Sequence, residues 1–250
     1  MVGALMWLAI CTRPDMSYAV GQLSRYASNP GKPHADAVTQ CLRYLRGTVD
    51  YRLTYIGKGR TEDVPPLIGY SDADWAGDLD TRRSTTGYLF RLSGGAVSWQ
   101  SKRQRTTAQS TVEAEYMAAA AATKESVWLR LLLTGIGCAP AGPIVLHVDN
   151  EGAIKLAENP CHHDLTKHIG VRYHLIRDHI ADGNIALTHI GTQFQAADVL
   201  TKGLLRERHR DAIGMLGIRD TVPFEGRVGT EASETTLPAG SSGHLSDRGT

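Results

Sequence analysis

Four acidic residues in this sequence have the side chains and the local settings of a metal centre. They are Asp72, Glu115, Asp149 and Asp198. Each lies in a segment whose pattern directs a carboxylate toward the end of a strand or the beginning of a helix. Hard oxygen ligands of this kind suit Mg²⁺, with Mn²⁺ as an alternative, and not zinc. Two such ions about 3.5–4 Å apart can activate water and stabilise a leaving oxygen, so the sequence predicts two-metal phosphodiester hydrolysis.

Neighbouring acids have local roles that leave Asp72 and Glu115 for the metal. Asp72 and Asp74 alternate along a predicted strand end, so both point to one side of the sheet, and we assign only Asp72 as a ligand. Two positions along a helix turn the side chain by about 200°, so Glu113 and Glu115 cannot share a target. Ser110 and Glu113 have the spacing of a capping box, which leaves Glu115 to face the sheet.

The last two acids follow the same logic, and a histidine lies before the fourth. Asp149 follows an apolar strand, and the adjacent Asn150 can cap the next helix in its place. Asp198 lies among apolar residues, where an unpaired carboxylate needs a cation or hydrogen-bond donors. Without bound ions, close acids would raise one another's pKa. His189 could shuttle protons or assist product release at such a centre, and a surface histidine at a strand end is the competing interpretation.

Composition and charge favour a folded protein without a strong global field. The chain has 250 residues, of which 42% are apolar and 21% charged, which fits one complete domain with additions. Its formal net charge is +1, so any nucleic-acid contact must come from local patches. Lys102, Arg103 and Arg105, beside Trp99, form the candidate patch for nucleic acid. A solvated basic face is the alternative for this patch and for those at 82–83 and 202–210.

The cysteines and the apolar N-terminus indicate an intracellular protein that does not cross a membrane. The cysteines at positions 11, 41, 138 and 161 are scattered without a C-x-x-C pair, which excludes a disulfide framework. The crowded Cys161-His-His is interpreted as a polar loop and not as a zinc site. Residues 1–10 are apolar but too short to span a bilayer, so we expect a packed helix.

Hydrophobic periodicity predicts an α/β fold. Helices are expected within residues 1–50, at 111–133, 151–158 and 168–181, and as a closing helix at 193–204. Strands are expected at 67–71, 86–92 and 96–101, which form an antiparallel group, and at 144–148 and 184–190. The tail from residue 221 is rich in Gly, Ser, Thr and Glu and is expected to be disordered. A five-stranded mixed sheet flanked by helices, preceded by a small helical segment, follows.

Several of these segments resemble one known family. They include Tyr70-Ser-Asp-Ala-Asp-Trp-Ala-Gly-Asp, Ser84-Thr-Thr-Gly-Tyr, Glu113-Ala-Glu-Tyr-Met-Ala, Val148-Asp-Asn and Ala197-Asp-Val-Leu-Thr-Lys. Residues 66–205 resemble the ribonuclease H domain of copia-type LTR retrotransposon Pol polyproteins, and residues 1–58 resemble the adjoining end of reverse transcriptase. The resemblance implies a ribonuclease H-like fold and endonucleolytic cleavage of RNA in RNA–DNA hybrids during reverse transcription. It also implies that the four acids bind Mg²⁺ and that the polymerase portion of the polyprotein is a partner.

Departures and alternatives accompany this resemblance. Gly170 stands where the family usually has Asp, and Ile190-Gly replaces a typical Val-Pro, which affects loops and not the acids. The polymerase motif Tyr-x-Asp-Asp is absent from this sequence. A silent relic or a domesticated nucleic-acid-binding module is one alternative, and an integrase-type core, whose last ligand is generally Glu, is another. The expected location is the cytoplasm, a virus-like particle or the nucleus.

Overall fold

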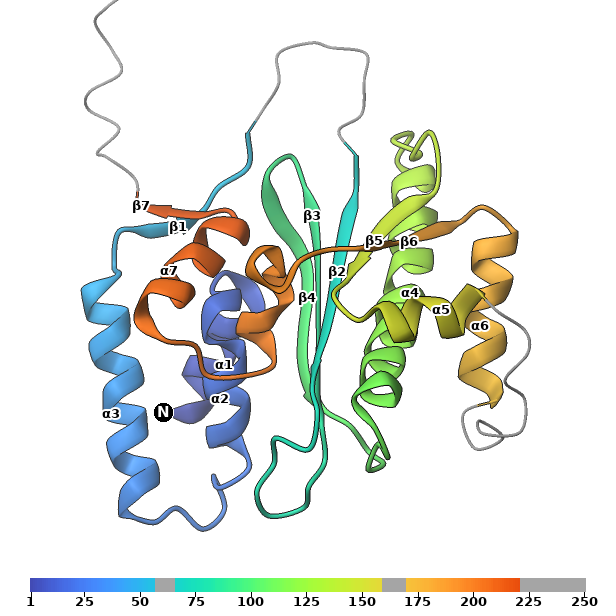
Figure 1. The fold of residues 1–250 in the computed structure, drawn as a ribbon. Coiled ribbons are helices and arrows are strands. Elements are labelled where there is room, and N and C mark those ends of the chain that lie inside the picture. The colour runs from blue at the N-terminus through green and yellow to red at the C-terminus, as the bar shows by residue number, and fades with distance from the viewer. Residues whose placement is uncertain (57–65, 159–169, 221–250) are drawn as a thin grey trace, which may run out of the picture. The chain divides into compact units, whose positions relative to one another are not determined.

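A computed structural model describes residues 1–56, 66–158 and 170–220 (Figure 1). The predicted tail at 221–250, the predicted boundary between residues 58 and 66, and the segment that begins at Cys161 lie largely outside the described residues. Residues 1–220 form one compact unit. None of the described helices is both long enough and apolar enough to cross a membrane.

The N-terminal segment is helical, as predicted. It consists of α1 (Val2–Cys11), a 3-10 turn η1 (Pro14–Met16), α2 (Ser17–Ser24) and α3 (Lys32–Gly47). A buried ion pair of 2.7 Å joins Arg13 to Asp15 at η1, and the hydroxyl of Tyr44 donates to the same carboxylate at 2.6 Å. A buried carboxylate without partners would be costly, so Asp15 keeps both partners. Because Tyr44 belongs to α3, its bond to Asp15 fixes α3 against η1.

The central sheet has five strands, which confirms the predicted mixed sheet. Its strands are β2 (Ile68–Asp74), β3 (Thr85–Leu92), β4 (Gly95–Arg103), β5 (Ile144–Val148) and β6 (Ile185–His189). They lie in the order β4-β3-β2-β5-β6, with β2, β3 and β4 antiparallel and with β5 and β6 parallel to β2 (Figure 1). These directions agree with the ribonuclease H-like fold that the resemblance implies.

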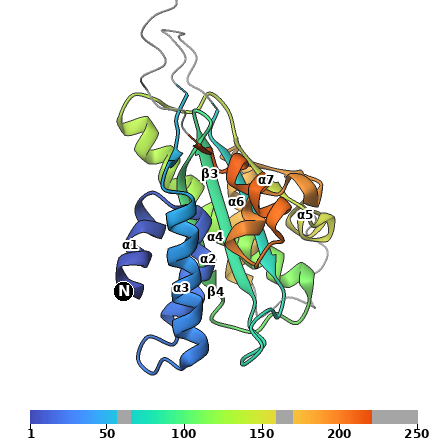
Figure 2. The same ribbon diagram turned by 90° about the vertical axis from the view of Figure 1, so that its left-hand side faces the viewer.

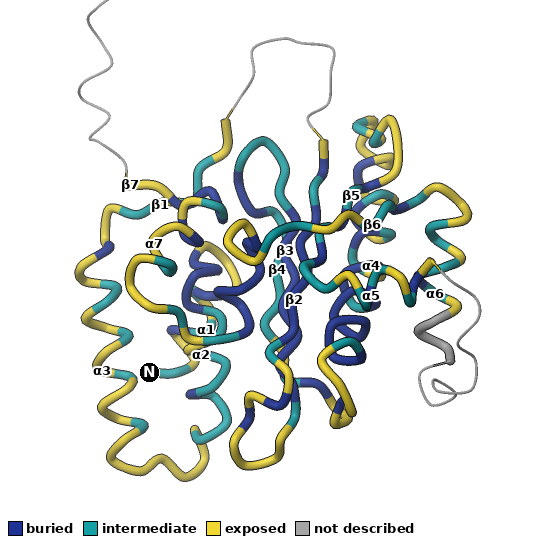
Figure 3. The backbone as a smooth tube through the Cα atoms, in the orientation of Figure 1, coloured by how far each residue is buried: buried dark blue, intermediate teal, exposed yellow. Residues whose placement is uncertain are grey.

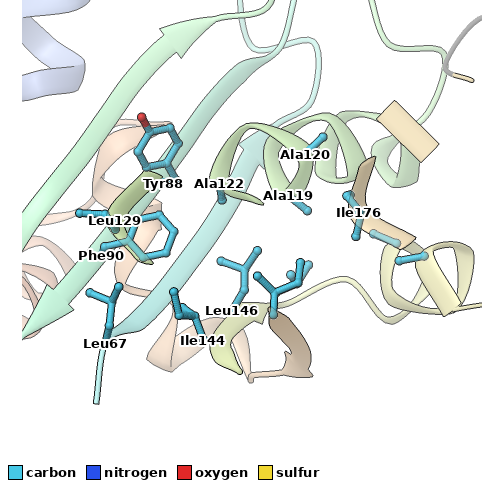
Figure 4. Close-up of a cluster of buried hydrophobic side chains, with 14 of the residues drawn as sticks. Leu67, Tyr88, Phe90, Ala119, Ala120, Ala122, Leu129, Ile144, Leu146 and Ile176 are labelled. Atoms are coloured by element: carbon cyan, nitrogen blue, oxygen red, sulfur yellow. The ribbon is translucent and has the colours of Figure 1, made fainter. Parts of the chain in front are cut away.

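Three helices pack against one another and the sheet around the main core. They are α4 (Thr111–Gly135), α5 (Glu151–Glu158) and α6 (Gly170–Ala181). The run of alanines at 118–122 lies on α4, and its small side chains allow the helix to approach the sheet closely. Figure 4 shows Ala119 and Ala122 near the large side chains Phe90, Leu146 and Ile176. Burial is concentrated on β2, β3 and α4 in Figure 3, so the site elements rest on the best-packed part of the fold.

The predicted closing helix at 193–204 is wrong. Two 3-10 turns, η4 (Thr192–Phe194) and η5 (Ala196–Leu200), occupy this region, and the helix α7 (Arg206–Met215) follows. The buried amide of Gln195 interrupts a regular helix because it donates to the carbonyl of Ser71 at 2.9 Å and accepts from the N–H of Ala197. At Gly87 of β3, an added Cβ would lie only 2.9 Å from the Cβ of Leu200, so η5 depends on this glycine to reach the sheet.

A second, two-stranded sheet was not predicted. β1 (Tyr51–Leu53) pairs antiparallel with β7 (Ile218–Asp220), and the shortness of both strands leaves little periodicity to detect. Figure 2 shows α3 and α7 close to each other, and the rings of Tyr44 and His209 meet at 5.6 Å between them. The N-terminal helices and the end of the described chain are therefore packed together.

A buried carboxylate links the N-terminal helices to the loop between β2 and β3. The side chain of Asp78, only 3% exposed, pairs with Arg103 at 2.6 Å and with Arg25 of the α2 C-cap at 3.0 Å. Hydrogen bonding from Thr81, and then from both guanidinium groups, holds the pKa of Asp78 well below its usual value. This ion-pair cluster fixes the loop that follows Asp72 and Asp74.

We predict that Asp78→Asn lowers the stability of the protein at neutral pH. The change leaves two guanidinium groups without their partner, and the expected loss in free energy of unfolding is on the order of 2 kcal/mol. A carboxyl whose folded pKa is lowered stabilises above its unfolded pKa, so the difference from the wild type shrinks as pH falls below about 4. Thermal unfolding at several pH values measures this. The control is Asp80→Asn, because the Asp80 side chain is 66% exposed; equal melting temperatures for both variants would contradict the prediction.

Candidate metal centre

Three of the four predicted acids converge at the centre of the sheet. One carboxylate oxygen each from Asp72, Glu115 and Asp149 lies within 4.8 Å of the others. The register pairs Ser71 of β2 with Val148 of the parallel neighbour β5, so the next residues of both strands, Asp72 and Asp149, emerge side by side. Glu115 reaches them from α4, which packs across β2, and its Oε1 accepts a hydrogen bond of 3.1 Å from the N–H of residue 73.

The beginning of α4 turns Glu115 toward the sheet. The side chain of Ser110 caps the helix and accepts from the N–H of Glu113, as predicted. The Glu113 carboxylate accepts from the N–H of Gln109 at 2.7 Å, one residue before the position that a capping box requires. Glu113 thus serves the helix terminus, and Glu115 faces Asp72.

Asp149 is available to the site because its neighbour caps the next helix. The side chain of Asn150 accepts from the N–H of Ala153 at 3.0 Å at the beginning of α5, as predicted. The hydroxyl of Thr192, in η4, donates to Asp149 Oδ2 at 3.3 Å. This bond orients the half-buried carboxylate toward the cluster without neutralising it.

Asp198 does not join the three-acid group among the described residues. Its side chain is 3% exposed, and its Oδ1 lies 2.9 Å from the ammonium of Lys202. Its Oδ2 lies 3.2 Å from the guanidinium of Arg208. The need for a compensating charge, inferred from the sequence, is therefore met by two basic side chains of the same segment. Asp198 still adjoins the group through Lys202, whose ammonium also lies 3.8 Å from Asp72 Oδ2.

Burial and mutual repulsion favour the protonated forms of the clustered acids. Burial, with a further contribution from Asp198, raises the pKa of Asp72 to about 7, against the opposing effect of Lys202. Burial, followed by the charges of Asp72 and Asp149, raises the pKa of Glu115 to about 9. Burial also raises the pKa of Asp149. A cation placed among these groups would reverse all of these shifts.

The donor set fits a divalent cation. Glu115 Oε2 is buried and has no hydrogen-bond partner among the described residues, although its other oxygen is bonded. A buried oxygen of this kind is costly unless a cation or donor reaches it. In the described part of the chain, three carboxylates converge here without thiolates or imidazoles, and such a set is the kind that binds a hard cation such as Mg²⁺ or Mn²⁺.

His189 ends β6 and lies outside the acid cluster. It is exposed, and its backbone pairs with Val148 of β5, the residue before Asp149. The chain beyond it returns to the site, because the N–H of Ile190 donates to the carbonyl of Val148 at 3.0 Å. Its role in proton transfer or product release stays a prediction.

The predicted basic patch is divided between two environments. The indole N–H of Trp99 donates to the carbonyl of Ala9 at 2.8 Å, so this ring lies against α1, and Arg103 pairs with the buried Asp78. Lys102 and Arg105 remain exposed and line a groove of about 210 Å³ between β4 and α4. Lys124 of α4, which the sequence did not indicate, lines the same groove.

Other side chains at the centre were also missed. The hydroxyl of Thr201 donates to Asp72 Oδ2 through a short hydrogen bond and to the Asp198 carbonyl at 3.0 Å. Lys202 and Arg208 contact the Asp198 carboxylate, whereas the sequence suggested only a basic surface there. Their spacing in the sequence could have indicated them, because Thr201 and Lys202 stand three and four residues after Asp198 and residues so spaced are neighbours on a helical turn.

Comparison with known proteins identifies the family. No family model matches the chain. The retrovirus-related Pol polyprotein from transposon TNT 1-94 of Nicotiana tabacum is 46% identical over 217 residues, which are 86% of this chain. The corresponding polyprotein from transposon RE2 of Arabidopsis thaliana is 41% identical over 228 residues, or 91% of this chain. The chain belongs to the retrovirus-related transposon Pol polyproteins.

The match to the Pol family covers most of this chain but little of its relatives. The chain spans 16% of the TNT 1-94 polyprotein and 15% of the RE2 polyprotein. The secreted RxLR effector protein 161 of Plasmopara viticola is 55% identical over 128 residues, which are 51% of this chain and 87% of that protein. Among solved structures, LC11-RNase H1 from compost is similar at 17% identity and a TM-score of 0.41, covering 60% of this chain and 99% of that chain.

The titration of this Pol segment's acids predicts how stability depends on pH and metal. A raised carboxyl pKa means that the folded state binds more protons than the unfolded state, so metal-free stability falls as pH rises from about 4.5 toward 9. Glu115→Gln removes the part of this loss that Glu115 contributes and is expected to raise the metal-free melting temperature by about 4 °C or more at pH 8. Thermal unfolding in EDTA measures it.

The same experiment with Mg²⁺ supplies the control. Mg²⁺ should stabilise the wild type more at pH 8 than at pH 5.5, because protons compete with the ion for the carboxylates. Asp182→Asn, a change at an exposed acid that directly follows α6, should behave as the wild type. A Glu115→Gln protein that is less stable than the wild type in EDTA at pH 8 would refute the assignment.

Proposed function

We propose that this chain is a ribonuclease H that cleaves the RNA strand of RNA–DNA hybrids during retrotransposon reverse transcription. The observation that carries the proposal is the convergence of two buried carboxylates, from Asp72 and Glu115, and the half-buried carboxylate of Asp149 within 4.8 Å. Membership of the transposon Pol family supports the proposal, because the relatives are retrovirus-related Pol polyproteins. Buried acids that destabilise one another have no evident structural purpose, so a ligand-dependent role explains them best.

The proposed cofactor is Mg²⁺, with two ions bound and Mn²⁺ as a substitute. Asp72, Glu115 and Asp149 would hold the metal, with Asp198 completing the set. Two bound ions supply an activated water and stabilise charge on the leaving oxygen of a phosphodiester. The protein contributes the positions of the ligands before substrate arrives, which lowers the cost of reorganisation.

Three hydrogen bonds hold the ligands in place. The hydroxyl of Thr201 donates to Asp72, the N–H of Ala73 to Glu115, and the hydroxyl of Thr192 to Asp149. All three donors are neutral, so they orient the carboxylates and leave their negative charge for the cation. Groups that orient ligands in this way contribute about 10–100-fold to metal affinity or activity in metal sites.

The proposed substrate is recognised by its backbone and shape. A hybrid duplex is A-form-like, so phosphate and 2′-hydroxyl contacts dominate and sequence preference is weak. Lys102, Arg105 and Lys124 supply exposed positive charge beside the groove between β4 and α4. We further propose that the polymerase portion of a Pol polyprotein is the partner that delivers the hybrid, inside the cell or a virus-like particle.

The first prediction of this proposal concerns cleavage. The purified chain with Mg²⁺ should cut the RNA strand of a labelled RNA–DNA hybrid and should leave duplex RNA and duplex DNA intact. Asp149→Asn should lower the rate by about 100-fold or more, because it weakens a metal ligand. Asp182→Asn is the matched control and should retain the rate. Hybrid binding without cleavage by the wild type would favour a binding module or a silent relic.

The second prediction concerns binding and separates the two halves of the basic patch. The double change Lys102→Ala and Arg105→Ala should weaken hybrid binding and reduce the slope of log K against log salt by about 2. Trp99→Phe should leave that slope unchanged, because the indole is engaged with α1. Fluorescence anisotropy of a labelled hybrid at several salt concentrations measures both. An unchanged slope in the double variant would exclude this groove as a phosphate contact.

A further inference from the structure

Lys202 bridges two of the acids assigned to the cation site. Its ammonium lies 2.9 Å from Asp198 Oδ1 and 3.8 Å from Asp72 Oδ2. Both carboxylate side chains are almost fully buried, at 3% and 2% exposure, whereas the lysine side chain is 36% exposed. The charge between the two acids is therefore supplied by a side chain that has access to solvent.

The backbone of Lys202 is fixed by hydrogen bonds, whereas its ammonium is held by ionic contacts with Asp72 and Asp198. The N–H of Lys202 donates to the Asp198 carbonyl at 3.2 Å, and the adjacent Thr201 is bonded to both Asp72 and Asp198. A lysine ammonium is a compact charge on a flexible four-carbon stem. Rotation about this stem moves the charge toward solvent without disturbing the turn that carries it.

Arg208 provides the contrast. Its guanidinium donates to the carbonyls of Thr192 and Gln193 through short hydrogen bonds and to Asp198 Oδ2 at 3.2 Å. Because it is anchored at three acceptors, it stays with Asp198 when Lys202 leaves. Asp198 therefore keeps one cationic partner and exposes its other oxygen toward Asp72.

We propose that Lys202 is a resident cation that occupies the place between Asp72 and Asp198 until a divalent ion displaces it. The proposal rests on the cation site of the proposed function but not on hydrolysis. Asp72, Glu115 and Asp149 offer a buried oxygen, Glu115 Oε2, that no described residue contacts by a hydrogen bond, so they take the first ion. A second ion between Asp72 and Asp198 has to displace Lys202, so this position binds more weakly and fills last.

The positive charge of Lys202 determines the order in which the two divalent ions bind. A divalent ion between Asp72 and Asp198 would have to occupy the place of the Lys202 ammonium, and two cations at one place repel each other strongly. Before the second ion binds, Lys202 thus reduces the electrostatic repulsion between the carboxylates of Asp72 and Asp198. The segment 198–202 acts as a positioning device that sets ion affinity, and Lys202 need not contact the reacting atoms.

Calorimetric titration of the full chain with Mg²⁺, without nucleic acid, tests the proposal. The wild type should bind one ion, and a second at least about ten-fold more weakly. Lys202→Met should strengthen the second event about ten-fold and change the first by less than about two-fold. The matched control is Lys155→Met, which removes an equal charge from another i,i+4 pair, the one between Lys155 and Glu151; it should leave both events unchanged.

A second variant covers the case in which Lys202→Met does not fold. Lys202→Arg keeps the charge and adds a planar fork that holds carboxylates more firmly, so it should weaken the second event further. A normal first event with an unchanged or weaker second event in Lys202→Met overturns the role of Lys202 alone. The absence of any Mg²⁺ binding in all proteins overturns the cation site and the proposed function with it.

Discussion

The repulsion among buried carboxylates at the end of β2 is the constraint on which the rest of the site depends. Asp72, Glu115 and Asp149 are brought together by the parallel register of β2 and β5 and by the packing of α4 on β2. Each element is stabilised elsewhere by apolar contacts, so the fold can tolerate a local cost at their meeting point. Close approach of α4 depends on the alanines at 118–122, since larger side chains there would move Glu115 away.

The surroundings of the three acids determine how much of this repulsion remains. Neutral donors orient Asp72, Glu115 and Asp149, whereas Asp198 pairs with Lys202 and Arg208, and the Lys202 ammonium also reaches Asp72. The η5 turn brings that second arrangement to the sheet because Gly87 lets it approach β3. The ion pairs of Asp78 then fix the loop after β2 to the N-terminal helices. Packing and electrostatics therefore act on the same few residues.

The sequence predicted the elements that carry strong periodicity and local capping. The sheet, α4 and the convergence of Asp72, Glu115 and Asp149 follow from strand order, from the Ser110 cap and from residues after apolar strands. The closing helix was wrong because propensity does not register that Gln195 bonds across to β2, 124 residues away.

Long-range pairing also explains the other differences. The strands β1 and β7 are only three residues each and are stabilised by each other. The sequence predicted Trp99 and Arg103 as surface residues beside Lys102, but Trp99 bonds to α1 and Arg103 pairs with Asp78.

The most direct test of the proposed metal centre is the anomalous difference map of crystals grown with Mn²⁺. It should show a peak about 2.0–2.4 Å from oxygens of Asp72, Glu115 and Asp149; a map without a peak there, with the three carboxylates turned apart, would contradict it.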